Sequence, residues 1–183
     1  MADLSCLIRF GVKGAGARAW LTDQNMLIPE RPNTWLPLSN GGLIARLGLT
    51  EFLIEDSVST SVVPLLAAAC QTPPEAVYPV PRQDLAIALF GTAVPELLLQ
   101  TCSVNFQTLD LSDRPVILTS MAGVTVTILP GERQSIPFYR LWCDGTFGVY
   151  LWRTLKAIAT ELDGSVAGFD QIRRLIDMGD RNQ

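Results

Sequence analysis

The sequence predicts an α+β fold, because strand-like and helix-like segments are mixed along the chain without strict alternation. Strand-like segments carry apolar residues at every second position, and helix-like segments carry them at every third or fourth position. The order strand, helix, pair of strands, helix occurs twice in the 183 residues. A chain of this length can bury one large core or two small fused ones.

The strongest strand–helix pair lies within residues 138–162. The alternating pattern predicts a strand with one face formed by Phe138, Arg140 and Trp142 and the other by Tyr139, Leu141 and Cys143. The helix is expected to begin after Asp144, which suits an N-cap, and to stop at Gly164, which suits the left-handed position after a helix. Its core-facing stripe is predicted to contain Phe147, Leu151, Leu155, Ile158 and Leu162.

The first half is predicted from the same patterns. We expect, in order, a strand at 7–12, a helix at 15–22 that turns Trp20 and Leu21 to the core, a loop at 28–38 with three prolines, a hairpin of strands 43–47 and 50–54, and a helix at 61–70.

The second half is predicted to begin after a stiff proline-rich connector at 72–81. We expect, in order, a strand at 84–90, a helix at 92–102, strands at 114–119 and 124–129, a polar turn at 130–135, the pair within 138–162, and an amphipathic segment at 169–178. The predicted domain is therefore 1–164, with halves of about 1–71 and 82–164, followed by a C-terminal helix or tail at 165–183.

Spacing within the first strand and helix supports the repeat. The apolar positions Ile8, Phe10 and Val12 and the following Gly14 recur at identical spacing as Leu85, Ile87, Leu89 and Gly91.

Composition argues against several classes of function. The chain contains no histidine, which excludes Ser-His and Cys-His catalysis and most zinc sites. Its net charge is −4 and it has no basic run, so a nucleic-acid partner is not expected. No stretch reaches the roughly 18 apolar residues of a membrane helix, and the start lacks a signal-peptide pattern. These features predict a cytoplasmic protein without a membrane partner.

The four cysteines are Cys6, Cys70, Cys102 and Cys143, each alone at an apolar position. No CxxC pair is present, and free cysteine packs as a small hydrophobic residue. We expect all four to be buried, reduced packing residues rather than nucleophiles.

Three segments resemble the gamma subunit of heterotetrameric sarcosine oxidase. They are a Gly-x-x-Ala start followed by Trp-Leu within 10–21, the glycine-led segment 41–54, and Phe-Gly-x-Tyr-Leu-Trp at 147–152. The resemblance covers about residues 7–162. That family is related in fold to the glycine-cleavage T-protein, the tetrahydrofolate-dependent aminomethyltransferase. The resemblance implies two duplicated ferredoxin-like halves that form a folate-binding type of fold, which agrees with the repeat.

The resemblance implies a partner rather than a catalyst. In that family the gamma subunit is similar to a folate-binding domain, while flavins, NAD and substrate belong to other subunits. The T-protein family has a catalytic aspartate in a Gly-x-x-x-Asp-Asp segment, whose nearest match here is 41–46. Ala45 and Arg46 stand at the acidic positions, so aminomethyl transfer is not expected. The implied partners are flavoprotein and folate-domain subunits, and tetrahydrofolate is the candidate cofactor.

Few side chains are candidates for binding. Lys13 and Arg46 lie at predicted strand ends beside glycines, where a folate tail or another anion could be met; the alternative is two solvated surface charges. Trp152 and Tyr150 flank the stripe of the long helix and are the candidate partner interface; core burial is the alternative.

No catalytic residue and no metal ligand is predicted. The one acidic cluster, Glu51, Glu55 and Asp56, is explained equally well by a solvated face and by a carboxylate pair.

The predicted function is therefore that of a non-catalytic sarcosine-oxidase-gamma-like subunit, or a stand-alone relative, associated with folate-linked amine demethylation. The alternative is a stand-alone folate-binding or aminomethyltransferase-like module. A homo-oligomer without a ligand is a third reading, because the mean hydropathy of +0.27 could accommodate a self-associating face.

Overall fold

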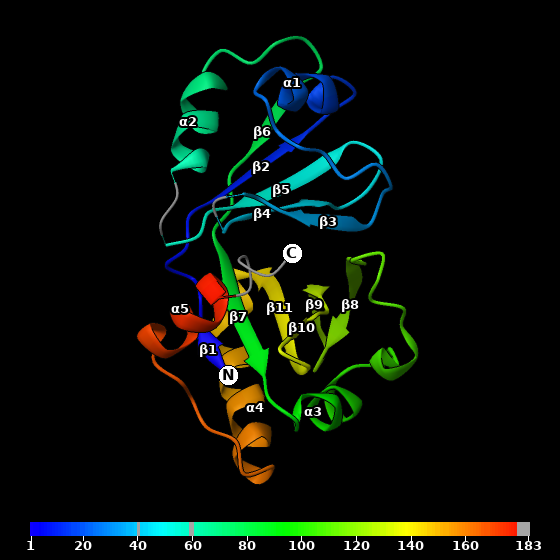
Figure 1. The fold of residues 1–183 in the computed structure, drawn as a ribbon, viewed down its shortest axis with the longest axis vertical. Helices are drawn as coiled ribbons and strands as arrows, with labels where there is room; N and C mark the ends of the chain where they lie inside the picture. The colour runs from blue at the N-terminus through cyan, green and yellow to red at the C-terminus, as the bar shows by residue number, and fades with distance from the viewer. Residues whose placement is uncertain (40, 59–60, 179–183) are drawn as a thin grey trace. The chain divides into compact units, whose positions relative to one another are not determined.

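The computed structural model describes residues 1–39, 41–58 and 61–178, with the side chains of 174–178 outside the description. The chain forms two compact units (Figure 1). Unit 1 contains Met1–Cys6 and Gln83–Leu175, and unit 2 contains Leu7–Arg82 and, among the described residues, 176–178 at the end of α5. Each unit is an antiparallel sheet with helices, so the predicted α+β class is confirmed. Within these described ranges, no helix is both long and apolar enough to cross a membrane.

Unit 2 is built on a five-stranded sheet with the order β3-β4-β5-β2-β6. Every neighbouring pair in it is antiparallel. Its elements are β2 (Arg9–Lys13), α1 (Ala17–Asp23), β3 (Thr34–Pro37), β4 (Leu43–Arg46), β5 (Glu51–Glu55), α2 (Val62–Ala69) and β6 (Tyr78–Val80).

Unit 1 is built on a sheet with the order β1-β7-β11-β9-β8, to which β10 adds by pairing with β11. Its strands are β1 (Ala2–Asp3), β7 (Asp84–Phe90), β8 (Ile117–Met121), β9 (Val124–Leu129), β10 (Glu132–Arg133) and β11 (Ile136–Asp144). Its helices are α3 (Val94–Thr101), α4 (Gly148–Glu161) and α5 (Phe169–Met178), with short 3-10 turns η1 (Phe106–Thr108) and η2 (Gly145–Phe147).

The two sheets have matching strand orders. If the elements are matched by their order along the chain, β3-β4-β5-β2 corresponds to β8-β9-β11-β7. Each sheet has one further strand at the end of this series, β6 beside β2 and β1 beside β7. In both units a strand leads into a helix, further strands follow, and a second helix comes next; there are three such strands in unit 2 and four, counting the short β10, in unit 1. The sequence predicted two strands between the helices of the first half, and the structure has three.

Four short strands were not predicted, among them β1 at the start of unit 1. Edge strand β3 lies in the proline-rich segment that was expected to be a loop, and β6 lies in the expected connector. Both are sheet edges, where a proline is tolerated because one side of the strand needs no ladder bond. The predicted turn at 130–135 contains β10, which forms a tight hairpin with β11 through Gln134 and Ser135. Both turn residues have positive φ, as a type I′ turn requires.

The core of unit 2 lies on one face of its sheet. Phe10 and Val12 from β2, Phe52 and Ile54 from β5, and the predicted Trp20 and Leu21 from α1 are buried together. Phe10 and Val12 therefore face the core as predicted, but Ile8, predicted on the same face, lies before β2 and is 55% exposed.

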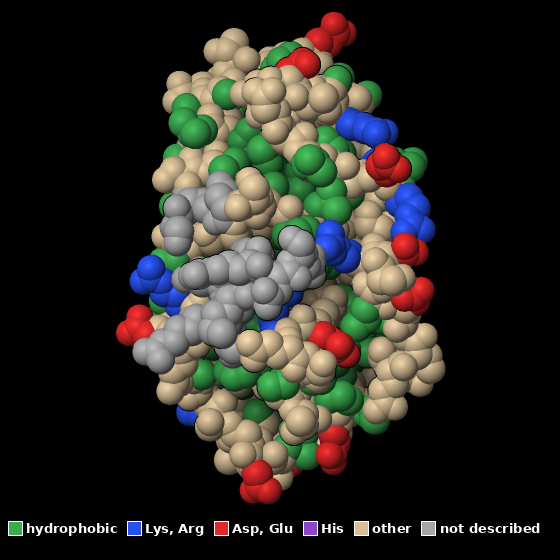
Figure 2. Space-filling view, viewed as in Figure 1, with side chains coloured by type: hydrophobic (Ala, Val, Ile, Leu, Met, Phe, Trp, Pro, Cys, Tyr) green, Lys and Arg blue, Asp and Glu red, His purple; other side chains and the backbone are tan. Residues whose placement is uncertain are grey.

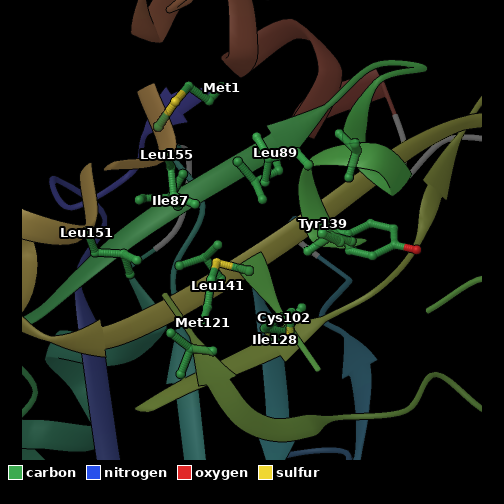
Figure 3. Packing of buried hydrophobic residues seen from close by; sticks show 14 of the residues in the cluster. Met1, Ile87, Leu89, Cys102, Met121, Ile128, Tyr139, Leu141, Leu151 and Leu155 are labelled. Carbon is green, nitrogen blue, oxygen red and sulfur yellow. The ribbon is translucent and has the colours of Figure 1, made fainter. Parts of the chain in front are cut away.

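The core of unit 1 lies between its sheet and the helices α3 and α4 (Figure 3). Tyr139, Leu141 and Cys143 of β11 face this core, as their alternation predicted. The helical stripe differs from the prediction at its start. Leu151 and Leu155 are buried, but Phe147 is 51% exposed because it belongs to η2, before the α-helical periodicity begins.

Both ends of the segment that holds α4 have recognisable caps. Asp144 accepts hydrogen bonds from the backbone N–H and the hydroxyl of Thr146, and these bonds hold the pKa of Asp144 below its usual value. At the other end, the N–H groups of Asp163 and Gly164 donate to the carbonyls of Thr160 and Ala159. This is a Schellman motif. Its left-handed residue is Asp163, with φ 58°, and not Gly164 as predicted.

Substitution of Gly11 tests the unpredicted pairing of β6 with β2. A Cβ at Gly11 would lie 2.9 Å from both the Cβ and the carbonyl oxygen of Val80 in β6. Because the backbone must shift to make room, we expect Gly11→Ala to lower the free energy of unfolding by about 1–3 kcal/mol in a urea titration. Gly48→Ala is the matched control, since no heavy atom lies within 4 Å of its added Cβ. Equal stability of the two variants would argue against the β2–β6 pairing.

Candidate functional site

Arg46, a predicted anion-binding residue, is buried at the end of β4 with 7% exposure. Its Nε donates to the carbonyl of Gly48 at 3.2 Å, and Nη2 donates to the carbonyl of Leu49 at 2.8 Å. Its Nη1 donates to the carbonyls of Pro29 and Glu30. The guanidinium therefore joins the segment before β3 to the turn between β4 and β5, and Arg46 is not the solvated charge considered as its alternative.

The ring of Phe52 supports this position of Arg46. The guanidinium carbon lies 5.8 Å from the centre of the ring, within the range of a cation–π interaction. Phe52 belongs to the core of unit 2, so the aliphatic part of Arg46 covers one end of that core. The guanidinium of Arg46 is then hydrogen-bonded to backbone carbonyls.

Lys13, the other predicted anion-binding residue, is exposed at the end of β2. Strand β5 lies between β2 and β4, so Lys13 and Arg46 are separated by one strand. Their side chains also point to opposite faces of the sheet. Lys13 alternates with the core residue Val12, whereas Arg46 lies on the same face as the core residue Ile44. The fold does not bring the two cations together.

The acidic cluster is not a solvated face. Glu55 and Asp56 are buried, with 0% and 1% exposure, and only Glu51 is partly exposed. Glu55 forms an ion pair with Arg9 at 3.0 Å. Asp56 accepts hydrogen bonds from the N–H groups of Val62 and Val63, at the start of α2. Each buried carboxylate thus has a structural partner, and a carboxylate needs one when it is removed from water.

Of the four cysteines, Cys70, Cys102 and Cys143 are buried as predicted, but Cys6 is exposed. Burial, together with the nearby carboxylates of Asp84 and Asp144, raises the pKa of Cys143 to about 11. A thiol with this pKa is protonated at neutral pH and is a poor nucleophile. The sequence could not show that Cys6 lies outside the core, because its apolar neighbours resemble those of a buried strand.

An exposed apolar surface lies on the end of η2 and the first turn of α4. It consists of Phe147, Val149 and Tyr150, which are 51%, 66% and 54% exposed, and we call it the α4 patch. The Tyr150 hydroxyl donates to the carbonyl of Ala122 in the β8–β9 turn at 3.1 Å, which fixes the ring against this hairpin. Large exposed aromatic side chains held in one place are typical of protein contacts.

Trp152 differs from Tyr150 in its surroundings. It is half-buried and packs against the core of unit 1. Sequence reasoning missed Phe147 and Val149, because Phe147 continued the apolar periodicity of α4 and Val149 had no aromatic character to single it out.

The described residues offer little for catalysis or metal binding. Among them, no group of three or more Cys, Asp and Glu side chains is arranged to hold a metal ion. On the face shown in Figure 2, Lys and Arg side chains are interspersed with Asp and Glu, and no continuous basic area is visible there. The features that favour interaction with another molecule are the α4 patch and its fixed tyrosine.

Substitution of Arg46 tests its role as a structural cation. We expect both Arg46→Met and Arg46→Lys to lower the free energy of unfolding by about 3 kcal/mol, because each leaves several carbonyls without their donor. Lysine retains the charge but cannot reproduce the planar set of donors. Lys13→Met, at an exposed position, should change stability by less than about 0.5 kcal/mol. An Arg46→Lys variant as stable as the Lys13→Met variant would contradict this role.

Thiol labelling tests the cysteine environments. At about pH 8 we expect the folded chain to react rapidly with a disulfide reagent such as DTNB at Cys6 alone, since only exposed thiolate reacts. Cys6→Ser should remove the rapid phase, and denaturation should expose the other three thiols. Rapid labelling of Cys143 in the folded state would show that its burial and raised pKa are wrong.

The sequence matches no protein-family model and no curated protein. Two solved structures share its fold. A chain of the heterotetrameric sarcosine oxidase from Corynebacterium sp. U-96, in complex with pyrrole 2-carboxylate, aligns with a TM-score of 0.63 and 16% identity. The alignment covers 99% of this chain and 85% of that one.

The second structure is the glycine cleavage system aminomethyltransferase T from Bartonella henselae, with a TM-score of 0.64 and 12% identity. That alignment covers 91% of this chain but 46% of the aminomethyltransferase, so the chain spans about half of that protein. At these identities the similarity shows a related fold: the chain is similar in fold to one chain of a sarcosine oxidase and to part of an aminomethyltransferase.

Proposed function

We propose that this protein acts mainly by association, as a non-catalytic subunit, or a stand-alone relative of one, in a sarcosine-oxidase-like system of folate-linked amine demethylation. The observation that carries the proposal is the extent of the fold similarity to a chain of heterotetrameric sarcosine oxidase. It covers 99% of this chain and 85% of the other. That oxidase is a heterotetramer, and the proposal assigns this chain a place in a comparable assembly.

The side chains support association more than catalysis. The buried charged groups Arg46, Glu55 and Asp56 are engaged in structural contacts. The α4 patch, in contrast, is apolar and solvent-exposed. Exposed apolar surface on a folded unit is a common feature of protein–protein contacts. We propose the α4 patch, with Tyr150 at its centre, as the contact with a larger flavoprotein or folate-domain subunit, and Trp152 as the residue that supports it from the core side.

A stand-alone folate-binding module is the second candidate, and the fold similarity to the aminomethyltransferase favours it. Tetrahydrofolate titration with tryptophan fluorescence would test it directly. A saturable change would support this candidate. Ala45 and Arg46 stand where the T-protein family has its acidic pair, so aminomethyl transfer is not expected even if folate binds.

We also propose that the two units arose by duplication of one ferredoxin-like unit. The matching strand orders support this, as does the recurrence of a glycine with positive φ, Gly14 and Gly91, after the first strand of each repeat.

The association is tested by mild affinity purification of the tagged chain from its own host, read by mass spectrometry of intact complexes. We expect a large flavin-bearing chain and a folate-domain chain to be recovered with it. The double variant Val149→Ser/Tyr150→Ala should lose these partners while retaining its thermal stability, because both side chains are more than half exposed.

Leu65→Ser is the matched control for this experiment. Leu65 is 71% exposed on α2, the helix of unit 2 that corresponds to α4, and its substitution should leave the partners bound. Recovery of the wild-type chain alone, or only as a homo-oligomer, would overturn the subunit assignment. Partner loss in the Leu65 variant, with none in the α4 variant, would move the contact to unit 2.

A further inference from the structure

Unit 1 contains a half-open cavity of about 380 Å³. Strand β7 ends at it, α3 begins beside it, and the C-terminal end of α4 forms its other side. The floor is apolar, and its main side chains are those of Met1, Leu89, Val94, Leu97, Ala159 and Leu162. Figure 3 shows Met1 and Leu89 within the same packed cluster as Leu155, so the floor is the edge of the unit 1 core.

The cavity is held open by the fold around it. Its walls contain small residues where larger ones would fill the space, namely Gly91, Ala93, Ala159, Gly164 and Ala167. Gly164 cannot be enlarged without displacing the end of α4, since an added Cβ would lie 2.8 Å from the Ala159 carbonyl oxygen. Protein cores rarely leave this much space unfilled, and its volume lies within the roughly 300–1,000 Å³ of small-molecule sites.

The segment that follows α4 forms the rim of the cavity and is hydrogen-bonded to Met1, the residue before β1. The amino group of Met1 donates to the Ser165 carbonyl at 2.9 Å, and the Ala167 N–H donates to the Met1 carbonyl at 2.8 Å. Farther along, the Gln171 side-chain oxygen accepts from the Gly168 N–H at 3.3 Å and so helps to start α5. These bonds make the rim a preformed part of unit 1.

The charges at the rim favour one kind of ligand. Among the side chains that line the cavity, Asp163 is the one that ionises. The positive end of the α3 dipole attracts an anion and the negative end of the α4 dipole attracts a cation. Their electrostatic effects on a ligand in the cavity therefore largely cancel. The amino group of Met1 is engaged by Ser165, and burial lowers its pKa, which weakens its positive charge. The carboxylate of Asp163 is then the main remaining charge at the rim, and it repels a negatively charged ligand.

We propose that this cavity binds a compact apolar molecule whose single polar head donates hydrogen bonds, an amine or an alcohol rather than a carboxylate. The apolar body lies on the floor formed by Leu89, Val94 and Leu97. The head lies at the rim, where the carboxylate of Asp163 accepts its hydrogen bond. This site is separate from the α4 patch and does not depend on the proposed association.

Three probes of the same shape test the proposal on the full chain: 3-phenylpropylamine, 3-phenylpropanol and 3-phenylpropionate. Binding is followed by the amide NMR signals of Gly91, Ala93 and Gly164, which line the cavity. We expect saturable shifts of these signals with the amine and the alcohol. The propionate should bind at least about fivefold more weakly, because its charge repels that of Asp163.

Two variants localise the effect. Ala93→Trp should abolish binding by filling the cavity; Ala93 has ordinary helical backbone angles and is half-buried, so the backbone tolerates a larger residue. Ala157→Trp is the matched control, on an exposed position of α4 away from the cavity. Asp163→Asn should strengthen propionate binding about fivefold, weaken amine binding and leave the alcohol unchanged. Asparagine is well suited to the left-handed backbone at this position.

The proposal is overturned if no probe gives saturable shifts, if the propionate binds most tightly, or if the shifts lie elsewhere in the chain. Retained binding in a folded Ala93→Trp variant would also overturn it. If Ala93→Trp fails to fold, the order of the three probes in the wild-type and Asp163→Asn chains decides the question. An amine preference that disappears in Asp163→Asn supports an amine ligand, and tighter binding of the alcohol in both chains supports an alcohol.

Discussion

The pairing of β11 with β7 is the interaction on which unit 1 depends. It runs over seven residue pairs, from Phe138 opposite Phe90 to Asp144 opposite Asp84. The other edge of β11 pairs with β9, so this strand joins the two sides of the sheet. A shift of one residue would turn Leu141 and its neighbours away from the helices, because side chains alternate between the faces of a strand. The register of this pair therefore fixes both the core and the place where α4 begins.

The features proposed for function lie at the two ends of α4, the helix that follows β11. The α4 patch starts immediately after β11, where η2 delays the helix and leaves Phe147 outside the core. The cavity lies at the opposite end of α4, where the Schellman motif turns the chain back toward β1. One well-packed helix thus presents two different surfaces, an apolar one at its start and a concave one at its end. Similarity of fold alone would not locate either surface, since function is determined by sites rather than by folds.

Much of the fold could be predicted from the sequence. Strands 84–90 and 124–129 were predicted with the observed limits, because their patterns are bounded by clear turn or loop residues. The amphipathic segment 169–178, predicted as a helix or a tail, is a helix. The short edge strands β3 and β6 could not be predicted, since their prolines favour loops and their pairing is decided by distant partners. The candidate site was harder to predict. Nothing in the sequence around Arg46 shows that four carbonyls from two loops converge on it, and the pattern around Phe147 indicated burial.

The position of β1 ahead of unit 2 in the sequence limits when this strand can find its partner during synthesis of the chain. Strand β1 belongs to unit 1, but its partner β7 begins at Asp84, after the Leu7–Arg82 part of unit 2 has been made. This part is continuous and holds the whole five-stranded sheet, so it can fold before the later strands of unit 1 are made, whereas the first residues must wait for a partner strand. Met1 and Leu4, which are buried in the finished fold, can be covered only after β7 has been made.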